Sequence, residues 1–240
     1  MKRGLSIVIP TYKENKNIKK LIKLVYKKIN LKFQNFEVII VDDNSKDGIE
    51  INYKKLKEKF FNLKLLVRKS YKKDLSKSCI MGFSKSRYSN ILVMDADLQH
   101  HPKYINLMLN NFIKNNFDIL VACRKFKYQS KVGLSNFRYF SSKVIIFIFN
   151  FFLGFKTNDP MSGFFIFKKK IFIKNNNRLF GRGYKILADL IYNSKDDLKI
   201  EDIFIDFQKR LVEKSKMNYK IVILLFIFLI KKILSKKELN

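Results

Sequence analysis

The chain has 240 residues, and 50 Lys or Arg against 20 Asp or Glu give it a formal net charge of +30. Its hydrophobic fraction of 47% can fill the core of one large domain or two small ones. The charge favours anionic partners such as nucleic acid, acidic lipid or phosphorylated substrates, although an AT-rich genome would produce the same excess of lysine. The lysines are spread along the chain without a basic arm, which weighs against a nucleic-acid-binding protein.

Several common features are missing from the sequence. Cys79 and Cys123 form neither a disulfide framework nor a metal-ligand spacing, so we expect a reducing, cytoplasmic compartment. The N-terminus does not resemble a signal peptide, and no segment reaches the ~20 consecutive apolar residues of a spanning helix. Two shorter apolar segments, Val144–Phe155 and Ile221–Ile230, suit either buried core helices or helices in a membrane interface.

Short apolar runs alternate with helical periodicity in the first half of the chain. This order predicts right-handed crossovers and a mostly parallel α/β sheet. The expected strands are Leu5–Ile9, Phe36–Val41, Leu63–Val67, Ile91–Met94 and Phe117–Ala122, and the first helix covers Asn17–Ile29.

The second half is less regular. We expect an apolar helix over Phe140–Phe155, a turn into a strand over Ser162–Phe167, a helix over Tyr184–Tyr192 and a strand over Ile200–Phe207. Lysine runs such as Lys168–Lys170 are interpreted as solvated surface. The chain contains no internal repeat and no Gly/Ser linker, which favours one continuous domain.

Polar clusters follow three of the expected strands. They are Tyr12 with Glu14, Asp42 with Asp43, and Asp95 with Asp97. Ligands of open α/β sheets bind outside the carboxyl ends of the strands. Acidic side chains gathered at one edge of a basic protein therefore indicate a functional site.

The pair Asp95 and Asp97 suits a hard divalent cation. Mg²⁺ takes one or two protein carboxylates together with waters and substrate phosphates, whose charge it neutralises. A bare D-x-D also fits a capped loop, but Gln99 and the other acidic clusters favour the metal site. We expect His100 and His101 to shape the loop and start the helix at Pro102 rather than bind metal.

Six segments in order resemble family 2 glycosyltransferases with the GT-A fold, and within them the polyprenol-phosphate sugar synthases. They are Ile7–Glu14 (IVIPTYKE), Val38–Gly48 (VIIVDDNSKDG), Val93–Pro102 (VMDADLQHHP), Asp159–Phe167 (DPMSGFFIF), Gly183–Leu190 (GYKILADL) and Arg210–Lys216 (RLVEKSK). The resemblance implies a Rossmann-like, mostly parallel sheet flanked by helices, with apolar interfacial helices in the C-terminal half. We expect residues 1–217 to form this domain and 218–240 to form an apolar and basic membrane-interface helix.

The resemblance also implies roles for single residues. The nucleotide-sugar site would comprise Pro10, Tyr12, Glu14, Asp42, Asp95, Ala96, Lys185, Arg210 and Lys216. Asp95, Asp97 and Gln99 would hold the metal, Mg²⁺ or Mn²⁺. Arg124, Arg138 and Ser142 would contact an acceptor phosphate, and the catalytic residues would be Asp97, Arg124 and Arg138.

The implied reaction is metal-dependent, inverting transfer of a hexose from GDP-mannose or a UDP-sugar to a polyprenyl monophosphate. Mannose is the expected sugar. The setting would be the cytoplasmic face of the membrane, in cell-envelope glycan biosynthesis. A lipid phosphate is already an anionic nucleophile, so positioning and charge stabilisation would replace a strong general base. The alternatives are transfer to a hydroxyl of a cell-surface glycan, which needs such a base, and a non-enzymatic basic protein that binds membrane or nucleic acid.

The chain departs from the family pattern in a few places. Asp74-Leu75-Ser76 stands where Gly-Leu-Gly is frequent, although related bacterial members resemble the form in this chain. Ala122-Cys123 replaces Gly-Ser before Arg124. Glu213-Lys214 replaces a Gly-Glu pair before Lys216, which would stiffen a loop there.

Overall fold

A computed structural model describes residues 2–29, 35–124, 154, 156–183, 186–194, 197–207 and 227. The expected apolar helix over Phe140–Phe155 therefore lies outside the described residues, apart from Gly154. The same holds for the expected C-terminal helix over 218–240, apart from Ile227.

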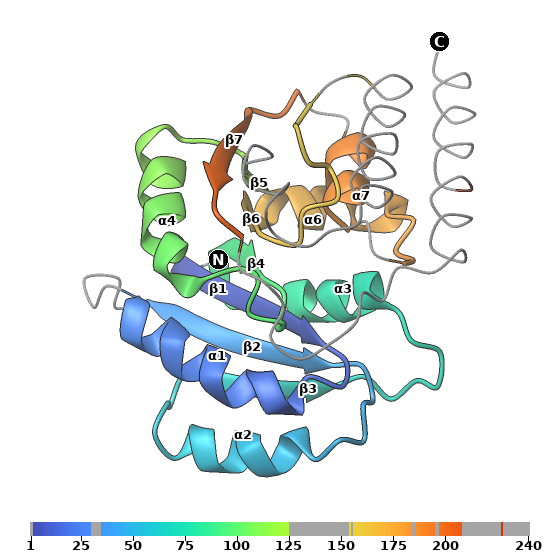
Figure 1. The fold of residues 1–240 in the computed structure, drawn as a ribbon. Coiled ribbons are helices and arrows are strands. Elements are labelled where there is room, and N and C mark those ends of the chain that lie inside the picture. Colours follow the sequence, from blue (N-terminus) through green and yellow to red (C-terminus); the bar gives the residue numbers. More distant parts are fainter. Residues whose placement is uncertain are drawn as a thin grey trace, which may run out of the picture.

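The described residues contain a seven-stranded sheet with the order β3-β2-β1-β4-β6-β5-β7 (Figure 1). All strands run parallel except β6, which is antiparallel to both of its neighbours. The predicted mostly parallel α/β sheet is confirmed. The strands are β1 (Lys2–Thr11), β2 (Phe36–Asp42), β3 (Leu63–Val67), β4 (Tyr88–Val93), β5 (Ile119–Arg124), β6 (Phe165–Lys168) and β7 (Ile200–Ile205).

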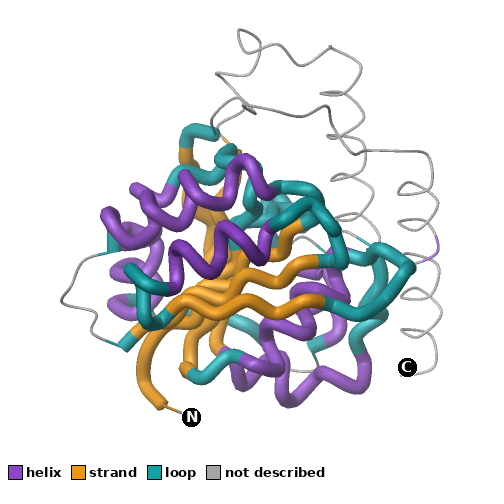
Figure 2. Tube along the Cα trace, turned by 90° about the horizontal axis from the view of Figure 1, so that it is seen from below, coloured by secondary structure: helices purple, strands orange, loops and turns teal. Residues whose placement is uncertain are grey.

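Helices cover both faces of the sheet (Figure 2). One hydrophobic cluster joins α1, α2 and α4 to one face, and a second joins α3, α6 and α7 to the other. The helices are α1 (Asn15–Lys28), α2 (Ile49–Lys57), α3 (Leu75–Lys85), α4 (Ile105–Lys114), α6 (Lys169–Asn175) and α7 (Ile186–Asn193), with short 3₁₀ helices at Pro102–Tyr104 and Asn176–Arg178. None of the described helices has the length and apolar character needed to cross a bilayer.

The central strands are apolar because both of their faces are buried. Along β1, Ile7 and Ile9 pack with α1, whereas Val8 packs with α3 on the other face. This double burial explains the continuous apolar runs that the sequence shows in place of strict alternation. The strands hold the polar side chains that follow them on a rigid support.

Pro10 lies inside a central strand, where proline is unusual because it cannot donate a ladder hydrogen bond. Pairing between β1 and β4 reaches only Val8 opposite Val93, and Met94 then donates its N–H to the Val8 carbonyl at 3.2 Å. Pro10 lies beyond this point, where β4 has already left the sheet. The proline therefore costs no ladder bond and marks the place where β1 and β4 separate.

One expected surface lysine is buried. Lys169, in the run read as solvated, is only 9% exposed, and its Nζ donates to the Ser86 carbonyl at 2.5 Å. The interpretation is therefore wrong for Lys169. The reason is that α6 begins at this residue and turns its side chain towards the start of β4.

Glu37 is a buried acid at the start of β2. It lies at the end of the strand away from the acidic clusters, and its contacts stabilise the fold. It accepts hydrogen bonds from the Ser6 hydroxyl (2.8 Å), the Arg87 N–H (2.6 Å) and the Lys64 ammonium (2.7 Å). Burial acts to raise the pKa of Glu37, but these donors outweigh it and leave the pKa below its usual 4.5. The ionised carboxylate is therefore the form that stabilises the fold.

We expect Glu37→Gln to lose about 1–3 kcal/mol of unfolding free energy at neutral pH. A lowered folded-state pKa gives stability that is present above the unfolded pKa of about 4.5 and is lost as pH falls through the folded pKa. The difference between variant and wild type should therefore shrink in acid. Urea unfolding across this range measures it, with Glu50→Gln on the exposed side of α2 as control. A difference that stays constant in acid would contradict the role of the charge.

Candidate functional site

The acidic clusters meet at one edge of the sheet. β1, β2, β4 and β5 are parallel, so their carboxyl ends share an edge, and the arrowheads of β1 and β2 point to the same side in Figure 1. β6 is antiparallel and therefore begins at this edge, between β4 and β5. From β2 to β5 the edge carries Asp42, Tyr12, Asp95, Gly163 and Arg124. The prediction that the acidic clusters converge on one edge is confirmed.

The loop after β4 holds Asp95 and Asp97 in a constrained backbone. Leu98 has φ +64°, which is costly for a side chain that branches, and it is almost fully buried. This turn brings the Gln99 N–H to Oδ1 of Asp97 at 3.1 Å. The Asp95 side chain remains 34% exposed, whereas Asp97 is buried. Strain that the surrounding structure maintains is typical of a functional loop.

His100 stabilises this loop through a hydrogen bond to its backbone. Its Nδ1 accepts the Asp95 N–H at 3.2 Å, and its ring stacks on Phe164 and meets the edge of Phe207. Because Nδ1 is an acceptor, a neutral ring carries its proton on Nε2. His101 caps the next helix, with its Nδ1 accepting the Lys103 N–H at 3.0 Å. The expectation that the two histidines shape the loop and start the helix is confirmed.

Gly163 lies directly against the Asp95 carboxylate. A Cβ on this glycine would sit 2.3 Å from Oδ2 of Asp95, far closer than non-bonded atoms approach. Just before it, the Ser162 hydroxyl donates to the Ala122 carbonyl at 2.8 Å and fixes the turn to β5. Gly163 lies in the segment Asp159–Phe167, and the sequence alone indicates no role for it. The glycine within the Ser-Gly turn was the only local signal, because its contact depends on where β6 enters the sheet.

The donor set of Asp95, Asp97 and Gln99 fits a hard divalent cation. Two carboxylates and an amide oxygen are oxygen ligands, and Mg²⁺ or Mn²⁺ would complete its shell with water and phosphate oxygens. The described part of the chain contains no cluster of three or more His, Cys, Asp or Glu that could enclose a metal by itself. A site of this kind therefore suits a cation that arrives with a phosphorylated ligand.

The end of β2 carries two buried acids with different surroundings. Both oxygens of Asp42 accept hydrogen bonds from Ser45, one from its N–H at 2.8 Å and one from its hydroxyl. Burial nevertheless raises the pKa of Asp42, opposed by these bonds. The neighbouring Asp43 forms an ion pair with Arg68 and accepts the Asp74 N–H at 2.6 Å. Asp43 thus ties the ends of β2 and β3 to the start of α3.

Two predicted site residues follow β1. One is partly exposed, and the other lies at the start of a helix. Tyr12 is partly exposed, and Nζ of Lys73 lies 4.1 Å from the centre of its ring. Glu14 is the N-cap residue of α1, and its carboxylate accepts a hydrogen bond from the Asn17 side-chain amide at 2.8 Å. The neighbouring Thr11 hydroxyl is buried and has no hydrogen-bond partner among the residues that the structure describes. Thr11 is thus a candidate ligand contact, and no pattern in the sequence indicates it.

Arg124 is the last residue of β5, and β6 lies between this strand and β4, which leads into the loop with Asp95 and Asp97. Its guanidinium lies 4.7 Å from the centre of the Phe207 ring. Nearby, Asp159 is buried, and its Oδ1 accepts the Met161 N–H at 3.2 Å. Burial raises the pKa of Asp159 to about 6, although the positive charge of Arg124 opposes the shift. Asp159 lies in the same segment as Gly163, and the sequence alone indicates no role for it.

Five predicted site residues cannot be placed. Arg138, Ser142, Lys185, Arg210 and Lys216 lie outside the described residues. Their roles therefore stay predictions.

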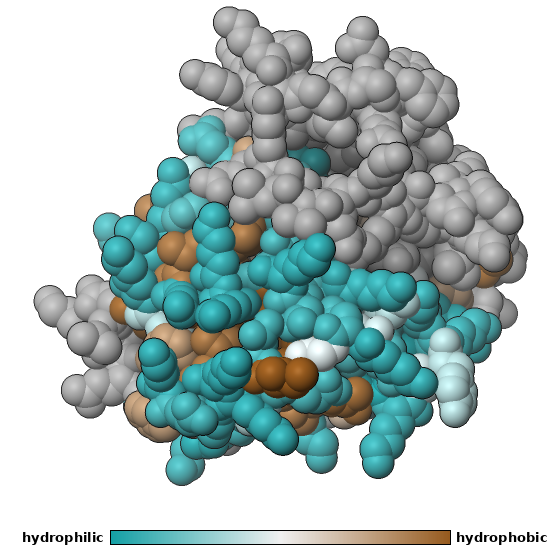
Figure 3. Space-filling view, turned by 60° about the horizontal axis from the view of Figure 1, so that its bottom comes forward, coloured by the Kyte–Doolittle hydropathy of each residue, from teal (hydrophilic) through white to brown (hydrophobic). Residues whose placement is uncertain are grey.

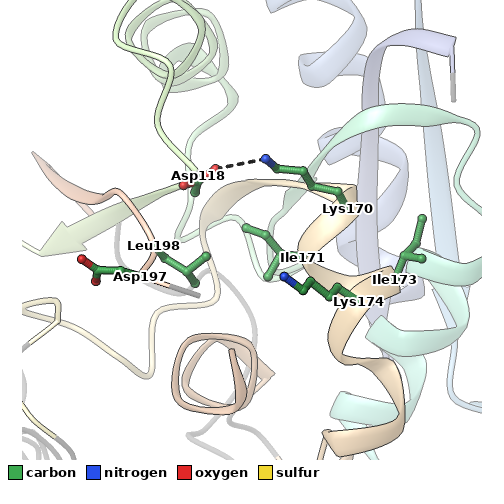
Figure 4. A pocket seen from close by; sticks show the side chains of 7 residues that line it. All are labelled: Asp118, Lys170, Ile171, Ile173, Lys174, Asp197 and Leu198. Atoms are coloured by element: carbon green, nitrogen blue, oxygen red, sulfur yellow. Dashed lines mark ion pairs between the residues drawn. The ribbon is translucent and has the colours of Figure 1, made fainter. Parts of the chain in front are cut away.

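A separate pocket of about 450 Å³ opens at the other edge of the sheet (Figure 4). Asp118 comes just before β5, and Lys170 is in the first turn of α6, so both lie at the amino end of the parallel strands. Their side chains point towards one another, with Nζ of Lys170 3.9 Å from Oδ1 of Asp118. This pocket holds neither the acidic pair nor Arg124, so we take the edge with Asp95 as the candidate site.

Comparison with known proteins matches residues 6–175 to the glycosyl transferase family 2. Two relatives are named dolichol-phosphate mannosyltransferase. The protein from Pyrococcus furiosus is 30% identical over 220 residues, and the match covers 91% of this chain but only 60% of that protein. The protein from Saccharomyces cerevisiae is 28% identical, with 91% of this chain and 82% of that protein covered.

Solved structures share the fold at low identity. Glucosyl-3-phosphoglycerate synthase from Mycobacterium tuberculosis, in a complex with Mn²⁺, UDP and glucosyl-3-phosphoglycerate, superposes with a TM-score of 0.70 at 15% identity, covering 97% of this chain and 79% of that one. Its UDP complex gives a TM-score of 0.73 at 13% identity, covering 96% and 80%. These similarities show the GT-A fold.

Proposed function

Because the chain belongs to glycosyltransferase family 2, we propose that it transfers a hexose, with mannose expected, from a nucleoside-diphosphate sugar to a polyprenyl monophosphate. The observation that carries this proposal is the acidic pair Asp95 and Asp97 on the same edge as Arg124, in a chain 27–30% identical to proteins named dolichol-phosphate mannosyltransferase. The acidic pair suits a metal-bound diphosphate, and the arginine suits a second phosphate.

The residue roles follow the order of the strands. Pro10, Tyr12, Glu14 and Asp42 would receive the base and ribose, and Asp95 with Ala96 would meet the diphosphate. Arg124, with Arg138 and Ser142, would bind the acceptor phosphate, because a guanidinium pairs with phosphate oxygens in a fork. Lys185, Arg210 and Lys216 would complete the basic surroundings of the donor diphosphate.

The proposed reaction is one in-line displacement with inversion. An oxygen of the acceptor phosphate forms a bond to the anomeric carbon while the bond from that carbon to the diphosphate oxygen breaks. The electron pair leaves with the nucleoside diphosphate. A divalent cation, Mg²⁺ or Mn²⁺, would supply Lewis-acid stabilisation of the leaving diphosphate. Arg124 holds the nucleophile in line, and the ionised phosphate has no proton to lose at the moment of attack.

A transfer assay tests the proposal and names the sugar. Purified protein, polyprenyl phosphate and Mg²⁺ or Mn²⁺ would be incubated with radiolabelled GDP-mannose, UDP-glucose or UDP-N-acetylglucosamine in turn. We expect metal-dependent label in the organic extract from one donor, GDP-mannose. Label absent from the lipid with every donor, while the donor still binds, would favour the glycan acceptor.

Asp159 is the observation that favours a second candidate, transfer to a sugar hydroxyl. That acceptor must lose a proton, and a buried carboxyl with a pKa of about 6 at this edge suits a general base. A phosphate acceptor requires no such group. The two candidates therefore differ in what they require of Asp159.

We expect Asp159→Asn to keep transfer activity within about tenfold, whereas loss of a general base costs about 10²–10⁴-fold. The variant should also be more stable than wild type at pH 8, by up to about 3 kcal/mol. A raised folded-state pKa gives stability that is present below 3.8 and is lost as pH rises through about 6, so the two proteins should converge near pH 4. Kinetics with unfolding at both pH values measure this. Loss of activity beyond a hundredfold would favour the hydroxyl acceptor.

We propose that residues 1–217 form the catalytic domain and that 218–240, with or without Val144–Phe155, bind the cytoplasmic leaflet. The support is compositional: apolar runs with lysines beside them in a chain of net charge +30. The face that carries α2 is largely hydrophilic, with apolar residues in separate small patches (Figure 3). The described surface seen there thus offers no broad apolar face of its own.

We expect the full chain to float with anionic liposomes at low salt and much less with neutral ones, because each lysine near an anionic leaflet contributes about 1 kcal/mol. Removing 218–240 should reduce flotation. A full-length protein that stays entirely at the bottom with anionic liposomes would contradict membrane binding.

A further inference from the structure

The segment Phe180–Gly183 is held at its first two residues by an acid on α7. Asp189 is 1% exposed, and its two oxygens accept the Phe180 N–H at 2.9 Å and the Gly181 N–H at 2.7 Å. The segment leads in sequence to Lys185, two residues beyond Gly183.

Gly183 is held by the start of α3, more than a hundred residues earlier in the chain. Its N–H donates to Oδ1 of Asp74 at 3.0 Å. Its carbonyl accepts both the N–H and the hydroxyl of Ser76, each at 2.9 Å. Gly183 has φ +85°, a conformation that side chains rarely adopt. We call Asp74, Ser76 and the Gly183 backbone the Gly183 clamp.

The Gly183 clamp connects to the end of β2. The Asp74 N–H donates to Oδ2 of Asp43 at 2.6 Å, and the Asp43 N–H donates to the Thr11 carbonyl at 2.9 Å. Asp43 is the direct neighbour of Asp42. A continuous set of hydrogen bonds thus runs from the ends of β1 and β2 to Gly183.

We propose that Asp74 and Ser76 are positioning residues for the donor: they fix the Gly183 backbone, two residues before Lys185 in the sequence, relative to Asp42. This inference rests on the proposed function, in which Asp42 and Lys185 contact the nucleotide sugar. Glycines at positions 74 and 76, as are frequent in the family, would carry no side chain to hold Gly183. In this chain both residues supply a side chain that holds Gly183.

Ser76→Ala is the cleanest variant. It removes the hydroxyl bond to Gly183 and leaves the backbone bond in place. Ser78→Ala is its matched control, because Ser78 is also buried on α3 but donates to the Asp74 carbonyl within the helix. Asp74→Ala is less clean, since Oδ1 of Asp74 also caps α3 by accepting the Lys77 N–H at 3.2 Å. Asp74→Asn keeps an acceptor for both donors and serves as the rescue.

We expect Ser76→Ala to raise the donor KM about tenfold and to change the acceptor KM by less than about twofold. Ser78→Ala should match wild type in both constants, and Asp74→Asn should lie much closer to wild type than Asp74→Ala. A purely structural role would lower the melting temperature and kcat without separating the two KM values. Equal donor KM values for Ser76→Ala and Ser78→Ala would overturn the inference.

Failure of the proposed function would look different. In that case the wild type would transfer sugar from no donor, and the Gly183 clamp would be tested in the ligand-free protein by amide hydrogen exchange over residues 180–183. We expect exchange about tenfold faster in Ser76→Ala than in Ser78→Ala. Equal exchange in the two variants would overturn the clamp itself.

Discussion

Asp97→Asn should abolish transfer, with a loss of about a thousandfold or more, while the fold stays intact. The side chain keeps its size, and its amide oxygen still accepts the Gln99 N–H that Asp97 accepts at 3.1 Å. What disappears is one of the two carboxylate charges that suit a divalent cation. The loss should therefore appear in metal-dependent turnover and in metal-dependent binding of the nucleoside diphosphate, and not in thermal stability.

Asp47→Asn is the matched control for that experiment. Asp47 lies after β2, and its replacement removes the same charge. One of its oxygens accepts the Asn15 N–H at 3.0 Å and the other accepts the Ile49 N–H at 3.3 Å, and asparagine keeps an oxygen for the shorter bond. We expect near-normal kinetics for this variant. A folded Asp97→Asn protein with near-normal activity would contradict the assignment of the metal site.

Gly163→Ala should lower activity about a hundredfold with little change in stability. The new methyl group would sit 2.3 Å from Oδ2 of Asp95, so the carboxylate must move away. Asp95 is partly exposed and can rotate, which keeps the cost to the fold small, but a displaced carboxylate no longer suits the cation. Kinetics at several Mn²⁺ concentrations should show that the variant needs more Mn²⁺ than wild type to reach half of its maximal activity.

Gly82→Ala provides the contrasting control. Its methyl group would meet Cγ1 of Val8 at 2.4 Å in the core on the other side of the sheet. Overpacking of this kind costs about 1–3 kcal/mol. Gly82→Ala should therefore lower the unfolding free energy and leave unchanged the Mn²⁺ concentration that gives half-maximal activity. Wild-type activity and metal dependence in Gly163→Ala would show that its contact with Asp95 is irrelevant to function.

The elements and the acidic edge could be predicted because their signals are local. Leu63–Val67 was expected as a strand and forms β3 with those bounds. Asp95 and Asp97 stand out as acids directly after an apolar run, and parallel strands place their carboxyl ends together without further information. Local patterns therefore sufficed for the parallel strands and for the acidic residues that follow them.

The supporting contacts could not be predicted because they join distant parts of the chain. Gly163 meets Asp95 only because β6 enters the sheet antiparallel between β4 and β5, and no periodicity specifies that position. The same holds for Gly183 and Asp74, which lie 109 residues apart. Lys169 was misread because lysine is usually exposed, whereas here a carbonyl accepts its buried ammonium.

Transfer to a phosphate and transfer to a hydroxyl can be separated with two acceptors that differ only in the phosphate. With the active donor and a divalent cation, label would be followed into polyprenyl phosphate and into the corresponding polyprenol. We expect metal-dependent label in the phosphate acceptor and none in the alcohol, because in the proposed reaction Arg124 would bind the acceptor phosphate and no general base would act. Equal labelling of both acceptors, or transfer to the polyprenol alone, would contradict it.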